Sequence, residues 1–224
     1  MQKIIAAILC LSLASCASIR PENATNYESQ LQYPDETGNF VMINKKVFDE
    51  PMLGILLEYT NKQYTRDNID VYVYPIASFD WSDAEETLNG EMQRVLAEID
   101  QAIEYGHYQN RGPEVTEPYA FSQGGKQFSG LKSSFELTDK NGIKYYSNAY
   151  VFLDKDKYLK FRTSFNSIDT VPWNGDEAVN ELLPAIEVPG ESEYMAGLRA
   201  EHKKRFTQHI MKLLLQAAQE NPEE

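Results

Sequence analysis

The chain has 224 residues, of which 42% are hydrophobic and 12% aromatic, and its formal net charge at pH 7 is −13. This composition is typical of a soluble globular domain, and the length suffices for one domain that buries roughly 70% of its unfolded surface. The negative charge disfavours nucleic acid and anionic lipid as general partners, because both would be repelled.

The first residues predict export from the cytoplasm. Lys3 precedes an apolar run from Ile4 to Leu13. This run is too short to cross roughly 30 Å of hydrocarbon as a helix, so it indicates a signal peptide that is removed.

Leu13-Ala14-Ser15-Cys16 resembles the lipobox of bacterial lipoproteins. In that family the chain is cleaved directly before the cysteine, and the cysteine carries the lipid. The resemblance therefore implies cleavage between Ser15 and Cys16 and lipidation of Cys16, which would attach the protein to a membrane. The alternative is an ordinary secretory peptide that is cut after Ser18.

Residue 17 is Ala, whereas an Asp at this place resembles an inner-membrane retention signal of enteric bacteria. By that resemblance we expect the outer membrane, with the protein facing the periplasm. The other cysteine, Cys10, lies within the signal. The mature domain would then contain neither a disulfide nor a free thiol, although disulfides are permitted in that compartment.

Residues 17 to about 38 are polar and precede the first apolar strand pattern. We therefore expect a signal peptide over residues 1–15, a lipid-anchored flexible tether over 16–38, a single domain over 39–220 and a polar tail over 221–224.

Three segments after the tether are rich in β-branched and aromatic residues, which predicts strands. They are Phe40–Ile43, Gly54–Tyr59 and Ile69–Tyr74, and Pro75 ends the third one or places it at an edge.

The segment from Ser82 to Tyr105 predicts a long helix. Ser82 and Glu85 form a capping-box pattern at its start, and Gly106 is a natural stop. Apolar residues recur at spacings of three and four, and they include Leu88, Met92, Val95, Leu96, Ile99 and Ile103. We expect the seven acidic residues that alternate with them to form the solvent face: Asp83, Glu85, Glu86, Glu91, Glu98, Asp100 and Glu104.

Strands return between Val115 and Phe165, with turn signals at Asp139–Gly142 and Asp154–Lys157. The C-terminal part is helical in two pieces, Asp176–Leu183 and Ser192 to about Gln219. The apolar stripe of the second piece consists of Met195, Leu198, Phe206, Ile210, Leu213, Leu214 and Ala217.

This element order predicts an α+β fold with an antiparallel meandering sheet packed against one long central helix and C-terminal helices. From Phe40 to Gln219 the order resembles the PsbP-like and DcrB-like group, which includes small bacterial lipoproteins and binding modules. That resemblance implies a binding or assembly role more readily than catalysis, and it supplies no site residues.

Motifs for catalysis, cofactors and metals are absent from the sequence. It contains no CxxC, HExxH, EF-hand loop or Gly-x-Ser-x-Gly elbow, and we expect no metal and no cofactor. Gly124-Gly125-Lys126 lacks the spacing of a phosphate-binding loop, so it predicts a hairpin turn.

Two features suggest a binding surface. The first is a basic cluster on the last helix, with Arg199, Lys203, Lys204 and Arg205 as candidate partner-binding residues; the alternative is that they pair with the domain's own acids. The second is a set of aromatic residues that line a groove or simply pack in the core: Tyr119, Phe121, Phe128, Phe135, Tyr145, Tyr146, Tyr150, Phe152, Tyr158, Phe161 and Phe165.

The leading hypothesis is a lipid-anchored periplasmic binding or envelope-assembly accessory protein without catalytic activity. Its partners would be the membrane, through the lipid on Cys16, and another envelope protein. One alternative is a periplasmic hydrolase that cleaves sugar or peptide through clustered carboxylates. Another is a structural or stress-response envelope lipoprotein.

Overall fold

The computed structural model describes residues 25–65, 67–165 and 174–220 of the chain, and it confirms the α+β class. Eight antiparallel strands form one sheet: β1 (Phe40–Val47), β2 (Ile55–Asn61), β3 (Asn68–Pro75), β4 (Tyr108–Arg111), β5 (Val115–Gln123), β6 (Lys126–Asp139), β7 (Lys144–Asp154) and β8 (Lys157–Phe165). The helices are α1 (Tyr27–Gln30), α2 (Ala84–Glu104), α3 (Gly175–Leu182) and α4 (Glu193–Glu220), with short 3₁₀ turns η1 (Pro51–Leu53) and η2 (Leu183–Ala185).

The sheet order is β1-β2-β3-β8-β7-β6-β4. β5 lies off this path and pairs with the same edge of β6 as β4 does: β5 pairs with Lys126–Ser134, and β4 pairs with Leu137–Asp139. Long hairpins build most of this order, and the predicted turn signals are confirmed. At the β6–β7 turn Gly142 has a φ of 82°, and the Asp139 carboxylate accepts hydrogen bonds from the backbone N–H groups of Asn141 and Ile143, both at 2.8 Å. Gly124 and Gly125 form the β5–β6 turn, also with positive φ.

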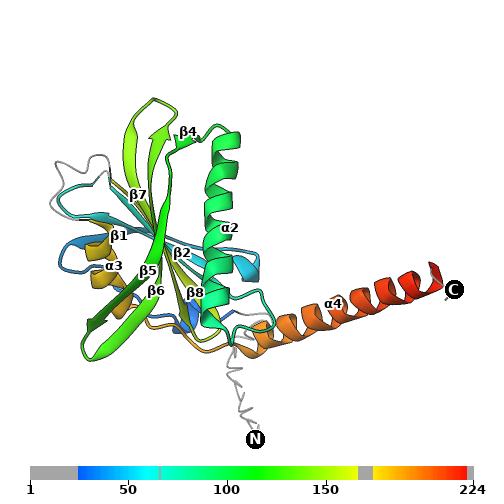
Figure 1. Cartoon of the computed structure of the whole chain (residues 1–224). Coiled ribbons are helices and arrows are strands. Elements are labelled where there is room, and N and C mark those ends of the chain that lie inside the picture. The colour runs from blue at the N-terminus through cyan, green and yellow to red at the C-terminus, as the bar shows by residue number, and fades with distance from the viewer. Residues whose placement is uncertain (1–24, 66, 166–173, 221–224) are drawn as a thin grey trace, which may run out of the picture.

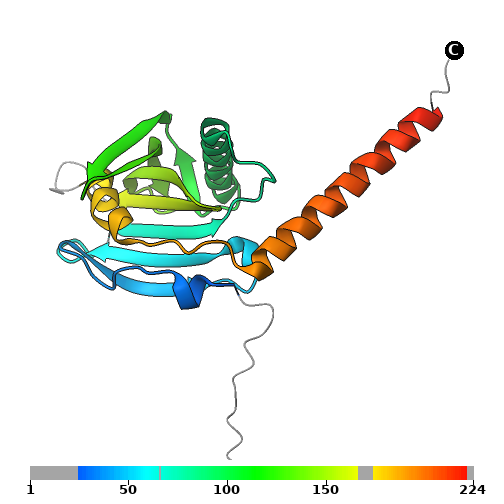
Figure 2. The same cartoon turned by 90° about the horizontal axis from the view of Figure 1, so that it is seen from below.

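Alternation along the strands divides the buried residues between two faces of the sheet. On β7, Tyr150 and Phe152 belong to one core, together with α3, whereas Ala149 and Val151 belong to the other core, together with α2. Figures 1 and 2 show α2 lying along the half of the sheet formed by β6 and β7. The start of α2 also reaches β3, because Tyr74 packs in the same core as Met92 and Val95.

The expected boundary of the tether at residue 38 is wrong. Residues 27–38 belong to the folded body, because Tyr27 and Leu31 are buried in the core beneath α3. Backbone hydrogen bonds join Gln32 and Glu187 at 3.1 and 2.9 Å, so this segment is fastened to the chain that precedes α4. The polar composition of this segment predicted a tether, although Tyr27 and Leu31 within it are buried.

The predicted capping box at Ser82 and Glu85 is displaced by one residue. Asp83 is the N-cap of α2, and its carboxylate accepts a hydrogen bond from Glu86 N at 3.0 Å. Ser82 N instead donates to Asp80 Oδ1 at 2.9 Å, in a turn that precedes the helix. Asp is as good an N-cap as Ser, so the sequence allowed both starts.

The last helix differs from the expectation that its whole stripe packs on the sheet. Ser192 Oγ caps α4 by accepting from Met195 N at 3.2 Å, and Met195 is buried. From residue 201 to 216 every side chain is exposed, and Figures 1 and 2 show the helix projecting away from the body. Within the described residues, no helix is both long and apolar enough to span a membrane.

Candidate functional site

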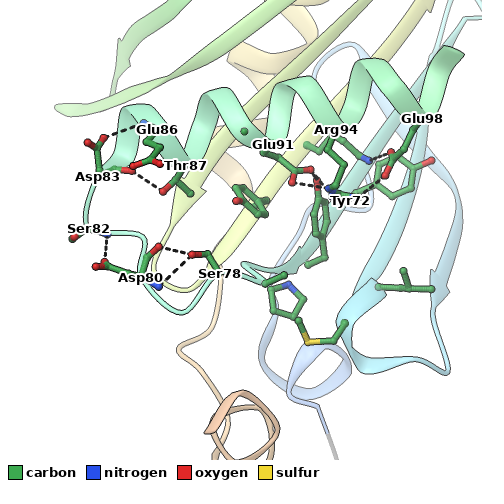
Figure 3. A pocket seen from close by; sticks show the side chains of 18 of the residues that line it. Tyr72, Ser78, Asp80, Ser82, Asp83, Glu86, Thr87, Glu91, Arg94 and Glu98 are labelled. Carbon is green, nitrogen blue, oxygen red and sulfur yellow. Dashed lines mark hydrogen bonds and ion pairs between the residues drawn. The ribbon is translucent and has the colours of Figure 1, made fainter. Parts of the chain in front are cut away.

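The main concavity is an open groove of about 850 Å³ beside α2. Figure 3 shows its side chains. Its floor is formed by Tyr72 and Tyr74 of β3 with Tyr158 and Lys160 of β8. The first turns of α2 and the loop before it form one wall. Phe48, Met52 and Leu53, on and beside η1, supply an apolar wall opposite.

Strand pairing explains why these floor residues meet. β3 and β8 are antiparallel neighbours in which Tyr72 lies opposite Lys160, and Tyr74 lies opposite Tyr158. Residues two apart on a strand point to the same face, so all four side chains share the face that α2 partly covers.

A connected set of charged groups links α2 to this floor. Glu91 accepts hydrogen bonds from the Tyr74 hydroxyl and from Arg94 Nε, the latter at 2.9 Å. Arg94 also bonds to Glu98, whose Oε2 lies 3.1 Å from Lys160 Nζ. Two carboxylates thus neutralise two cations, and each of the four charged groups has a partner within the set.

The expectation that all acids of this helix face solvent is therefore wrong for Glu91. Its exposed fraction is only 5%, because it lies at the edge of the apolar stripe and points toward the sheet. A buried carboxylate needs hydrogen-bonding partners, and here Tyr74 and Arg94 supply them.

The faces of the floor tyrosines are already occupied by the protein's own cations. Lys160 Nζ lies 4.6 Å from the ring centre of Tyr72 and 5.2 Å from that of Tyr74. The Arg94 guanidinium lies 5.4 Å from the Tyr74 ring. A ligand cation cannot take these same positions, so the groove is not arranged as an aromatic cage.

Burial controls the ionisation of the floor. It raises the pKa of Tyr72 to about 12, with a smaller contribution from Asp70, and raises that of Tyr158 to about 12, assisted by Glu91. Burial lowers the pKa of Lys160, while Glu98 acts in the opposite direction. The hydroxyls therefore stay protonated at neutral pH and present hydrogen-bonding groups instead of charge.

The rim at the start of α2 carries the uncompensated charge of the groove. Asp80, Asp83 and Glu86 line it, whereas the described lining has no cations besides Arg94 and Lys160. The hydrogen bond from Ser82 N holds the pKa of the Asp80 carboxyl below its usual value, so this group is ionised at neutral pH. The groove thus combines a neutral polar floor, an apolar wall and an acidic rim.

The basic residues predicted to bind a partner occupy different environments. Arg199 is fixed within the body, since it pairs with Glu191 at 2.8 Å, donates to Ser78 O at 3.0 Å and lies 4.6 Å from the Trp81 ring. For this residue, the alternative of pairing with the domain's own acids is confirmed.

The three neighbouring basic residues lie on the projecting part of α4. Arg205 forms an ion pair with Glu201 one turn earlier, and Lys203 and Lys204 are exposed. They do not line the groove. Cys16 and the cleavage site at Ser15 lie outside the described residues.

Most of the aromatic set predicted from the later strands packs in or against the two cores, as the alternative held. Tyr119, for example, donates to Asn180 Oδ1 at 2.8 Å and contacts the Tyr150 ring edge-on. Of that set only Tyr158 lines the groove. In the described part of the chain, no group of three His, Cys, Asp or Glu side chains is placed to hold a metal ion.

The site residues predicted from the sequence do not include Tyr72, Tyr74 or Lys160. One signal was available, because Glu91 and Glu98 lie seven residues apart on the same edge of the helical stripe, with Arg94 between them. Such a polar strip beside an apolar one indicates partners on a neighbouring element. Which strand supplies those partners depends on the sheet order.

The chain is similar in structure to proteins of known structure. The solution structure of cyanobacterial PsbP (CyanoP) from Synechocystis sp. PCC 6803 is similar, with 14% sequence identity and a TM-score of 0.44, over 79% of this chain and 99% of that chain. No protein-family model and no curated protein matches the sequence.

Proposed function

We propose that this chain is a lipid-anchored accessory protein of the cell envelope that binds a partner through the groove beside α2 and performs no catalysis itself. One observation carries the proposal. The groove is large and open, yet the ionisable groups that link α2 to its floor, of which Glu91 and Lys160 are buried, are joined to one another in a neutral set. Such a floor is preorganised for contact, since each charge is already compensated.

The composition of the groove defines the partner it would take. The acidic rim at Asp80, Asp83 and Glu86 favours a positively charged group, and the wall of Phe48, Met52 and Leu53 favours an apolar one. We therefore expect a basic segment of another envelope protein that carries an apolar side chain next to a Lys or Arg.

The proposed anchor keeps the groove near the membrane. Eight residues, 17–24, separate Cys16 from the described body, which begins at residue 25. A fully extended segment of that length spans at most about 30 Å. Replacing Cys16 by Ser should leave the protein unlipidated and soluble, and continued tight membrane association of Cys16→Ser would contradict the lipobox hypothesis.

Gly90 allows a direct test of the groove. It lines the groove from α2, and a Cβ built on it meets nothing within 4 Å. Gly90→Leu would fill the space and should also support the helix, because Gly is a poor helix former. The matched control is Gly197→Leu, on α4, where an added Cβ is equally unobstructed.

The measurement is chemical crosslinking in native cell envelopes, followed by affinity recovery and mass spectrometry. We expect a specific protein to be recovered with the wild type and with Gly197→Leu, and to be lost with Gly90→Leu. Equal recovery with all three proteins would refute the groove as the binding site.

A hydrolase remains the second candidate, because Glu91 and Glu98 approach the same groove. Both carboxylates bond to Arg94, so neither is free to act as an acid or base without first leaving that contact. Cleavage of an envelope glycan or peptide by the purified protein, abolished in Glu98→Gln, would favour this candidate. A purely structural or stress-response lipoprotein would tolerate Gly90→Leu without any loss of partner.

A further inference from the structure

The projecting half of α4, residues 201–216, exposes large apolar side chains that no other described element covers. Phe206, Ile210, Leu213 and Leu214 follow one another at spacings of four, three and one, and Leu214 is 62% exposed. The Phe206 ring lies 5.7 Å from Phe79, yet it is still 55% exposed. Beyond that contact the helix stands away from the body (Figures 1 and 2).

An isolated helix of this kind gains its stability by burying its apolar face against something else. The spacing places Phe206, Ile210, Leu213 and Leu214 within an arc of about 100° on the helix surface, at about 100° per residue, and the exposed Met211 and Leu215 extend this apolar surface on the side of Leu214. Gln216 lies on the opposite side of the helix, almost half a turn from Leu214.

The same part of α4 is positively charged. Between residues 201 and 216 it carries Lys203, Lys204, Arg205 and Lys212 against the single acid Glu201. An amphipathic helix with cationic side chains beside a wide apolar face is the arrangement that lies in the interface of an anionic bilayer. The excess of positive charge on this helix contrasts with the negative charge of the whole chain.

Pairing of two copies through α4 is less favourable. It would bring two cationic helices together, and the apolar repeat extends over only about two heptads, fewer than a stable coiled coil requires. An anionic membrane surface would instead neutralise the positive charge of α4, whereas a second copy of the helix would add to it.

The start of α4 lies beside Asn26, close to where the described body begins on the N-terminal side. Asn26 Nδ2 donates to Gly190 O at 2.6 Å, two residues before the helix cap at Ser192. The segment that leads to Cys16 and the helix thus leave the body from the same region. A lipid on Cys16 would hold α4 within reach of the bilayer.

We propose that the projecting half of α4 lies on the anionic phospholipid surface of the membrane that holds the N-terminal lipid, and that it thereby fixes the orientation of the domain. This proposal rests on the lipid anchor but not on the identity of the partner in the groove. The acidic body does not prevent this contact when its acidic groups face away from the lipid, because charges more than about 8 Å from the surface are largely screened at physiological salt.

The test measures insertion of the helix separately from attachment of the protein. In the lipidated protein the thiol of Cys16 is consumed, so Leu214→Cys introduces a unique thiol for an environment-sensitive fluorophore. Gln216→Cys, on the opposite side of the same turn, is the matched control. Each protein is reconstituted with vesicles of phosphatidylethanolamine with phosphatidylglycerol, or of phosphatidylcholine alone, and flotation is recorded in parallel.

We expect a blue shift of the fluorophore at position 214 on the anionic vesicles, and little shift at 216 or on phosphatidylcholine. Adding Lys203→Glu, Lys204→Glu and Arg205→Glu should abolish the shift at 214 while flotation persists. Flotation without a shift on anionic vesicles would overturn the proposal.

A shift at 214 that needs no vesicles and rises with protein concentration would also overturn it, and would assign the helix to a second copy or to the acidic groove of one. Loss of flotation on phosphatidylcholine would refute the lipid anchor instead. In that case the fluorophore signal on added anionic vesicles still decides the role of α4, because a shift at 214 supports surface binding and its absence refutes it.

Discussion

Replacement of Glu91 by Leu tests the connection between α2 and the floor of the groove. Glu91 is 5% exposed and accepts hydrogen bonds from Tyr74 and Arg94. Leucine is a good helix former, so the substitution leaves the helix itself intact. The substitution removes the carboxylate that accepts hydrogen bonds from Tyr74 of β3 and from Arg94.

The expected loss of stability follows from the two partners left behind. The Tyr74 hydroxyl becomes a buried donor without its acceptor, which costs about 1–3 kcal/mol. Arg94 is about half exposed and keeps its contact with Glu98, so losing its pair with Glu91 adds no more than about 1 kcal/mol. The free energy of unfolding should therefore fall by about 1–4 kcal/mol.

Urea unfolding, followed by tryptophan fluorescence, measures this change. With an m value of about 2 kcal/mol/M, the urea midpoint should fall by about 0.5–2 M. Glu85→Leu, at an exposed position on the same helix, is the control and should change the free energy of unfolding by less than about 0.5 kcal/mol. In a Tyr74→Phe background, Glu91→Leu should cost less by about 0.5–3 kcal/mol, because no hydroxyl is left unpaired.

An equal and small effect of Glu91→Leu and Glu85→Leu would falsify the buried network. It would mean that Glu91 is solvated and that α2 meets the floor only through its apolar stripe. Additivity of Glu91→Leu and Tyr74→Phe would contradict the direct hydrogen bond specifically, even if each single change were costly.

Three further predictions concern stability and titration. Lys157 is buried and pairs with Asp156 at 2.8 Å, so Lys157→Met should lower the free energy of unfolding by about 3–5 kcal/mol, and adding Asp156→Asn should recover part of that loss in thermal unfolding. A Cβ on Gly130 would lie 2.2 Å from a backbone carbonyl oxygen of β7, so Gly130→Ala should lower the free energy of unfolding in urea by more than 1 kcal/mol, whereas Gly197→Ala, where an added Cβ meets nothing within 4 Å, should not. Ultraviolet absorbance should show Tyr72 ionising near pH 12; because its folded pKa is raised, its contribution to stability is complete below pH 10 and disappears as the pH rises through about 12.

Local patterns in the sequence predicted most of the elements correctly. The stripe from Leu88 to Ile103 defines α2, and the alternation of Ile69, Val71 and Val73 defines one face of β3. Asn141-Gly142 predicted its hairpin because glycine tolerates the positive φ that the turn requires. Each of these signals is contained within one short segment.

The groove could not be predicted in the same way, because its residues come from segments far apart in the sequence. Lys160 and Tyr72 become neighbours only through the pairing of β8 with β3, which no local pattern specifies. Glu91 illustrates the same limit, since its side chain lies at the edge of the stripe and becomes buried only because Tyr74 and Arg94 receive it. The tether boundary failed for a related reason, as Tyr27 gains its burial from contacts beneath α3.

The distribution of charge relates the two proposed surfaces to each other. The hydrogen bond from Ser82 N is the main cause of the lowered pKa of the Asp80 carboxyl, and Lys203 of α4 acts in the same direction, so the acidic rim and the cationic helix influence each other. An anionic bilayer that attracts α4 would repel the rim at Asp80, Asp83 and Glu86, so the orientation of lowest energy turns the rim away from the lipid. A ligand would then enter the groove from the aqueous side. Crosslinks from Leu53, on the apolar wall, should therefore identify a soluble segment of a protein, and recovery of phospholipid at that position would contradict this orientation.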